Sequence, residues 1–140
     1  MSVPVVHEND IQEMDLPGRR MRWLISESGI AARHCSFCVI RVPPGEKVRP
    51  AHSHPNGEEV IYIMSGSGRV LVNQEVSTVK PGSTVLFPQG HVHMLHNTGN
   101  VEMKVACFFA PPTNLENYRM HEEVDFPDQT TGQVRTKESS

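Results

Sequence analysis

The sequence lacks long apolar runs and clusters of positive charge. Its two longest apolar runs, residues 60–64 and 105–110, are far shorter than the roughly 20 residues that a membrane-spanning helix needs. Lysine and arginine are scattered along the chain, and the formal net charge is -3. We therefore expect neither nucleic acid nor a membrane as a partner.

Cysteine is also scarce. Cys35, Cys38 and Cys107 are an odd number and give no disulfide framework. Cys35 and Cys38 are three residues apart, so on a strand their thiols point to opposite faces, which argues against a shared metal or redox site. We expect packed thiols in a reducing compartment. Residues 1–15 are acidic and have no apolar segment of the kind found in signal peptides, so the expected location is the cytoplasm.

Helical periodicity is missing from most of the chain, since no segment before residue 111 shows it for more than a turn or two. Short apolar segments separated by glycine and proline turns predict an all-β fold instead. A length of 140 residues without an internal repeat indicates one domain. The expected strands are residues 21–25, 37–42, 60–64, 69–73, 76–79, 84–87 and 101–109.

The two ends of the chain give weaker patterns. Met21, Trp23 and Ile25 alternate with other residues, which predicts a strand with one mostly apolar face. Residues 114–121 are expected to form a short helix. The polar residues from 128 onward have almost nothing to bury, and we expect them to be mobile or to lie on a neighbour.

Histidine, by contrast, occurs at informative spacings. His52 and His54 are two residues apart, and on an extended strand such side chains point to the same face. Glu59 stands at the head of the next apolar run, and His93 follows much later. Collecting all four around one metal ion requires a fold that brings distant strands together, as a small β-barrel does.

Two blocks of sequence carry this pattern. The first block contains Gly45, His52, His54, Glu59 and Gly66, and the second contains Gly82, Pro88, Gly90, His93 and Asn97. Together they resemble the two motifs of the cupin family, over about residues 35–110. The one departure is that six residues, not five, separate the first glycine from the first histidine, which lengthens a loop without disturbing a ligand.

The resemblance implies an architecture for the whole chain. A double-stranded β-helix, the jelly-roll barrel of small cupins, is expected over residues 31–112. Residues 1–30 would supply a short N-terminal strand or strands, and residues 113–140 a partly mobile extension. The resemblance also implies a homodimer, in which the strand at residues 21–25 adds to the neighbour's sheet.

Three imidazoles and one carboxylate form a ligand set of intermediate hardness. It suits Fe, Mn, Ni, Zn, Co or Cu and disfavours Ca or Mg. The predicted cofactor is therefore one divalent transition metal ion per chain, bound by His52, His54, Glu59 and His93. Such an ion can polarise a carbonyl, lower the pKa of bound water, or hold O2 beside a chelating substrate.

The resemblance implies two classes of function. One is a metal-dependent enzyme of the dioxygenase, isomerase or lyase type, acting on a small oxygen-rich molecule such as a keto or hydroxy acid. The other is a non-catalytic cupin that binds a small ligand or a metal. The complete ligand set favours the enzyme, although a fold alone does not decide between the two.

Further site residues are predicted less directly. His91 and His96 are candidate acids or bases and otherwise residues of the barrel mouth or surface. The candidates for lining the substrate cavity are Arg41, Ile61, Ile63, Leu95, Met103 and Phe109. Asn97 is expected to be structural, bridging backbone groups at the end of a strand.

Overall fold

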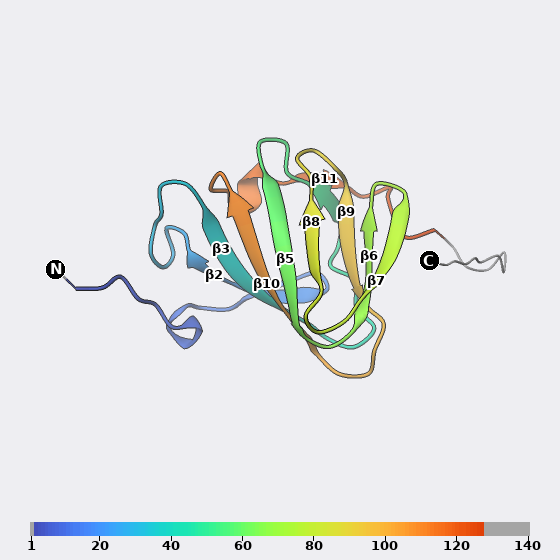
Figure 1. Ribbon diagram of the computed structural model, residues 1–140, viewed down its shortest axis with the longest axis horizontal. Helices are drawn as coiled ribbons and strands as arrows, with labels where there is room; N and C mark the ends of the chain where they lie inside the picture. The colour runs from blue at the N-terminus through green and yellow to red at the C-terminus, as the bar shows by residue number, and fades with distance from the viewer. Residues whose placement is uncertain (1, 128–140) are drawn as a thin grey trace.

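The computed structural model describes residues 2–127, and its strands form two antiparallel sheets that pack against each other (Figure 1). One sheet has the strand order β1-β2-β3-β10-β5-β8, and the other has the order β11-β4-β9-β6-β7. The helical segments among these residues are two short 3-10 turns, η1 Glu8–Asp10 and η2 Leu115–Asn117. The predicted all-β fold is confirmed, and no described helix is long and apolar enough to cross a bilayer.

The strands that were expected from the sequence are all present, with ends that differ by no more than two residues. The bounds are β1 Met14–Leu16, β2 Arg19–Ile25, β3 Ser36–Val42, β4 Ala51–Ser53, β5 Glu58–Ser65, β6 Gly68–Val72, β7 Glu75–Val79, β8 Thr84–Phe87, β9 His93–Asn97, β10 Met103–Ala110 and β11 Arg119–His121.

The C-terminal segment differs from its expectation. A short helix was expected over residues 114–121, but only the single turn η2 forms, and the next residues become strand β11. The reason is tertiary, because β11 pairs with β4 and places Met120 opposite His52. This pairing gives the edge of β4 its backbone partners. Residues 128–140, for which mobility was expected, lie outside the described residues.

The apolar core lies between the sheets and follows the alternation of each strand. On β5, Glu59, Ile61 and Ile63 face the interior, as the sequence predicted, while Tyr62 and Met64 are exposed on the outer face. Full burial of a side chain such as Ile63 contributes about 1.5–3 kcal/mol relative to its exposure. At the N-terminal end of the chain, β2 pairs with β3 and extends the same sheet.

Asn97 ties the end of β9 to two neighbouring segments. Its side chain is fully buried, and its amide nitrogen donates to the carbonyl oxygens of Val42 at 2.9 Å and Val101 at 2.8 Å. Its side-chain oxygen accepts from the backbone N–H of Gly99 at 2.9 Å. The predicted structural role of Asn97 is therefore confirmed.

Replacing Asn97 by Ala is expected to lower the free energy of unfolding by about 1–3 kcal/mol, because buried backbone groups lose their partners. Urea denaturation followed by circular dichroism measures the change. Asn100→Ala, an exposed position on the same loop, is the matched control and should stay within about 0.5 kcal/mol of the parent protein. Equal stabilities for the two variants would contradict the structural role.

Candidate metal centre

Four side chains meet inside the barrel. His52 lies on β4, His54 directly follows that strand, Glu59 lies on β5, and His93 begins β9. One ligand atom from each residue lies within 4.8 Å of the others. All four side chains are buried, with residue exposures of 3–6%. The residues predicted to bind a metal therefore form one cluster that could hold an ion.

Both sheets contribute to this cluster. His52 is directly opposite His93 in the pairing of β4 with β9, so these two imidazoles come from the five-stranded sheet. Glu59 comes from the six-stranded sheet, where it stands between Phe87 and Phe109 on the neighbouring strands. An ion bound here would therefore join the two sheets across the barrel interior.

Backbone carbonyls fix the tautomers of two of the imidazoles. His52 donates from Nδ1 to the carbonyl oxygen of Pro50 at 3.1 Å, and His93 donates from Nδ1 to that of His91 at 3.2 Å. A carbonyl oxygen can only accept, so Nδ1 carries the proton in each neutral ring. Nε2 then keeps the lone pair with which histidine binds a metal.

His93 Nε2 shows that these residues fit a cation. This atom is buried, has no hydrogen-bond partner among the described residues and lies 3.2 Å from Oε1 of Glu59. A nitrogen lone pair that faces a carboxylate oxygen is unfavourable unless a cation lies between them. The same oxygen lies 2.9 Å from Nε2 of His54, with the geometry of a hydrogen bond.

The protonation states also suit metal binding. Burial raises the pKa of Glu59, but the hydrogen bond from His54 and the approach of His93 outweigh it and hold that pKa at about 2. Burial lowers the pKa of His52 well below 6.5. At neutral pH the carboxylate is ionised and the His52 imidazole is neutral, which are the forms that bind metals.

Aromatic rings stack on two of the imidazoles. Phe87 stacks on His93 with ring centroids 3.8 Å apart and an angle of 6° between the planes. Tyr118 stacks on His52 at 4.6 Å and 17°. These flat contacts restrict rotation of the imidazoles and keep water from their faces.

The predicted cavity-lining residues fall into three groups. Phe109 contacts a cluster imidazole, with its ring edge-on to His54 at 5.2 Å. Four others are buried in the apolar core, namely Ile61, Ile63, Leu95 and Met103. Arg41 is a correction, because it lies on the outer face of β3 and pairs with Glu13 and Glu102. Side chains alternate along β3, and the residues on either side of Arg41 face the core.

Neither candidate acid or base belongs to the cluster. His96 lies on the outer side of β9, where its Nδ1 accepts a hydrogen bond from Arg69 at 2.9 Å and its ring packs against Phe126 at 5.6 Å. His91 is partly exposed in the turn before β9. Its backbone oxygen orients His93, while its side chain lines a separate hollow outside the barrel.

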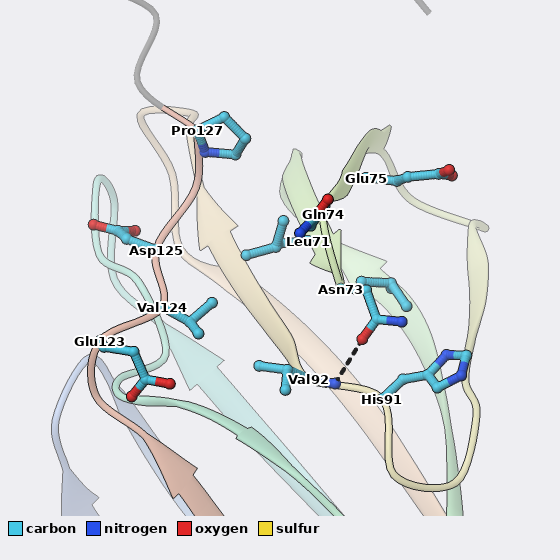
Figure 2. A pocket seen from close by; sticks show the side chains of 11 residues that line it. Leu71, Asn73, Gln74, Glu75, His91, Val92, Glu123, Val124, Asp125 and Pro127 are labelled. Carbon is cyan, nitrogen blue, oxygen red and sulfur yellow. Dashed lines mark hydrogen bonds between the residues drawn. The ribbon is translucent and has the colours of Figure 1, made fainter.

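That outer hollow has a volume of about 890 Å³ and lies between the β6–β7 hairpin and residues 123–127 (Figure 2). Val92 donates its backbone N–H to the side-chain oxygen of Asn73 at 3.1 Å across its floor. None of the four cluster residues lines it. Despite its large volume, this hollow is therefore separate from the predicted metal site.

A smaller hollow, of about 110 Å³, opens beside His54. Its other lining residues are Pro55, Asn56, Gly57, Pro111, Pro112, Thr113 and Asn117. This space is a few times the roughly 30 Å³ that a liquid water molecule occupies. A hollow of this size beside a predicted metal ligand suits a small molecule.

Three residues near the cluster were not predicted, namely Arg19, Phe87 and Tyr118. Arg19 is only 5% exposed and shares the core-facing side of β2 with Met21 and Trp23. The alternation that marked those two residues could have identified it. No sequence pattern pointed to Tyr118, which approaches the site from the C-terminal segment.

Comparisons with known proteins agree with this geometry. A family model described as "Cupin domain" matches residues 38–109. Uncharacterized protein MJ1618 of Methanocaldococcus jannaschii is 37% identical over 76 residues, which are 54% of this chain and 60% of that protein. The tetracenomycin polyketide synthase protein TcmJ of Streptomyces glaucescens is 30% identical over 94 residues, 67% of this chain and 62% of that protein. The chain thus covers less than two thirds of both relatives.

Among solved structures, that of a predicted oxalate decarboxylase from Thermotoga maritima superposes with a TM-score of 0.68. The sequences are 24% identical, and the match covers 76% of this chain and 98% of the other. A likeness at this level of identity shows a shared fold.

Removing two ligands is expected to abolish metal binding. The purified protein should carry about one equivalent of a transition metal, and the double variant His52→Ala, His54→Ala should carry almost none. Elemental analysis by mass spectrometry measures this content. His34→Ala, at an exposed position, is the control and should match the parent protein. Full metal content in the double variant would remove the assignment.

Acid is expected to destabilise the metal-free protein. The folded pKa of His52 lies below its unfolded value of 6.5, so its contribution is lost as the pH falls below 6.5. Glu59, with a folded pKa of about 2 against 4.5, contributes above pH 4.5 and loses this as the pH falls towards 2. The free energy of unfolding in urea should therefore decrease as the pH falls below 6.5, and His52→Gln should flatten the first part of that decrease. An unchanged slope in the variant would contradict the explanation.

Proposed function

Because the chain belongs to the cupin family, whose model matches residues 38–109, we propose that it is a transition-metal-dependent enzyme acting on a small oxygen-rich acid. The reaction would be of the oxidoreductase, isomerase or lyase type. The observation that carries the proposal is the buried His93 Nε2, which faces Oε1 of Glu59 at 3.2 Å and has no hydrogen-bond partner within residues 2–127.

Residues of this chain already hold the site in a geometry that suits metal binding. His52, His54, Glu59 and His93 would hold the ion, which would polarise a carbonyl or lower the pKa of a bound water. The Pro50 and His91 carbonyls keep two imidazoles in the tautomer that binds metals. Phe87 and Tyr118 cover ring faces and exclude water, which strengthens electrostatic interactions inside the site.

Two observations support a small, oxygen-rich substrate. The hollow beside His54 has a volume of only about 110 Å³. The similar proteins include a predicted oxalate decarboxylase and a polyketide synthase protein, whose names both refer to oxygen-rich molecules. A molecule with two neighbouring oxygen atoms could use the two positions that four protein ligands leave open on a six-coordinate ion.

The second candidate function is a non-catalytic cupin that binds a small ligand or a metal. The burial of all four cluster residues favours it, because a closed site also suits tight retention. A cytoplasmic homodimer is part of both candidates. Support for a dimer comes from apolar side chains that are exposed together on the outer face of the six-stranded sheet, namely Tyr62, Met64, Leu86 and Phe108.

Turnover distinguishes the two candidates. Protein loaded separately with Fe(II), Mn(II) or Zn(II) is incubated with a panel of keto and hydroxy acids, with O2 uptake followed by electrode and products by NMR. At least one acid should be consumed, and O2 uptake with Fe(II) would separate oxygen chemistry from isomerase or lyase chemistry. Glu59→Gln should reduce the rate by about 100-fold or more, because it removes a ligand charge.

Glu58→Gln is the control, since this exposed neighbour points out of the barrel and the variant should keep the parent rate. Saturable binding without turnover across the panel would contradict the enzyme and favour the binding protein.

A further inference from the structure

Arg19 is a buried cation that the metal centre does not use. It is 5% exposed and begins β2, on the side of the strand that carries Met21 and Trp23 into the core. Burial of a guanidinium costs several kcal/mol unless its donors find partners. The partners of Arg19 therefore need to be identified donor by donor.

Only one end of this guanidinium is occupied. Nη1 donates to the carbonyl oxygens of Pro17 at 3.2 Å and Arg49 at 3.0 Å. Nε is buried without a partner, and Nη2 makes no hydrogen bond within residues 2–127. The Nε–Nη2 edge is one of the two edges with which arginine holds a carboxylate through parallel hydrogen bonds.

The occupied end places Arg19 next to the metal centre. The Arg49 carbonyl accepts from Arg19, and the next carbonyl along the chain, that of Pro50, accepts from Nδ1 of His52. The segment of residues 49–52 therefore binds the Arg19 guanidinium through one carbonyl and also contains His52, a predicted metal ligand. Tyr118, whose ring stacks on His52, lies within electrostatic range of Arg19.

Tyr118 supplies another free donor. Its ring also meets the edge of His54 at 4.5 Å, yet its hydroxyl makes no hydrogen bond within the described chain. A tyrosine hydroxyl carries its proton at neutral pH and can therefore donate a hydrogen bond to an anion.

The charges of the interior favour an anion at these donors. In the metal-free chain, Glu59 is the carboxylate with which Arg19 interacts. A divalent ion at the cluster would take up that negative charge, and Arg19 would then add a further positive charge to the barrel interior. A buried excess of positive charge is stabilised by a ligand that brings negative charge with it.

We propose that Arg19 and Tyr118 form a second anchoring point, which binds a carboxylate at the end of the ligand remote from the metal. This inference rests on the proposed metal centre and narrows its substrate class to small dicarboxylic acids, including hydroxy and keto acids with a second carboxylate. Arg19 would hold the carboxylate through its Nε–Nη2 edge, and the Tyr118 hydroxyl would donate to it.

The test compares ligands that differ only in the second carboxylate. Isothermal titration calorimetry on the Zn(II)-loaded full chain measures malonate, succinate and glutarate against propionate, butyrate and valerate, which match them in length. One dicarboxylate should bind about tenfold or more tightly than its partner, as expected for a charged bidentate contact. Equal affinities within every pair would overturn the proposal and would assign Arg19 a purely structural role.

Two variants assign the preference to these residues. Arg19→Gln should abolish the dicarboxylate preference, whereas Arg20→Gln, at the exposed next position of β2, should keep it. Tyr118→Phe keeps the ring stacking and should weaken dicarboxylate binding several-fold without changing monocarboxylate binding. An unchanged preference in Arg19→Gln, or an unchanged dicarboxylate affinity in Tyr118→Phe, would overturn the role of that residue.

Failure here can be separated from failure of the proposed function. Zinc content and monocarboxylate binding report on the metal centre and do not involve Arg19. If the Zn(II)-loaded protein binds monocarboxylates and dicarboxylates equally, the second anchoring point is contradicted but the proposed metal centre is not. A protein that prefers dicarboxylates but turns over no acid contradicts the enzyme and keeps the second anchor.

Discussion

The burial of the Glu59 carboxylate is the constraint on which the rest of the centre depends. A charged group that is 5% exposed is stable only when donors or cations surround it. His54 and His93 approach one of its oxygens at 2.9 and 3.2 Å. The Nδ1 proton of His93 is already given to a backbone carbonyl, so its Nε2 brings no proton to this contact. A cation between the carboxylate and the imidazoles would complete this arrangement.

Strand pairing within the two sheets positions these groups. Pairing of β4 with β9 places His52 opposite His93, and β5 brings the carboxylate from the other sheet. The same interior contains a second charge, Arg19, whose Nε has no hydrogen-bond partner among residues 2–127. A metal ion in the cluster and this arginine would together form a site for an anionic ligand. Specificity would then come from the arginine, and reactivity from the metal.

The sequence predicted the cluster because each of its parts has a local signal. Two histidines two apart on a strand share a face. Ile61 and Ile63 lie two and four residues after Glu59, so they share its face of the strand, which is the interior one. Arg41 was misplaced because residues 37–42 are apolar at nearly every position, which hides the parity of that strand.

Long-range contacts explain most of what was missed. Tyr118 precedes a strand, β11, that forms by pairing with β4, and such a contact leaves no pattern in the local sequence. Arg19 is different, because the alternation of Met21 and Trp23 extends back to it. It was not predicted to be buried because arginine is seldom fully buried. For the same reason, its burial in this structure indicates a specific role.

The central claim is that one transition metal ion is bound by both sheets at once. X-ray absorption spectroscopy on the metal-loaded protein, combined with anomalous diffraction from its crystals, tests it most directly. We expect a single ion at about 2.0–2.2 Å from three imidazole nitrogens and one carboxylate oxygen, with the anomalous peak between His52, His54, Glu59 and His93. An ion elsewhere in the molecule, or one bound without Glu59, would contradict it.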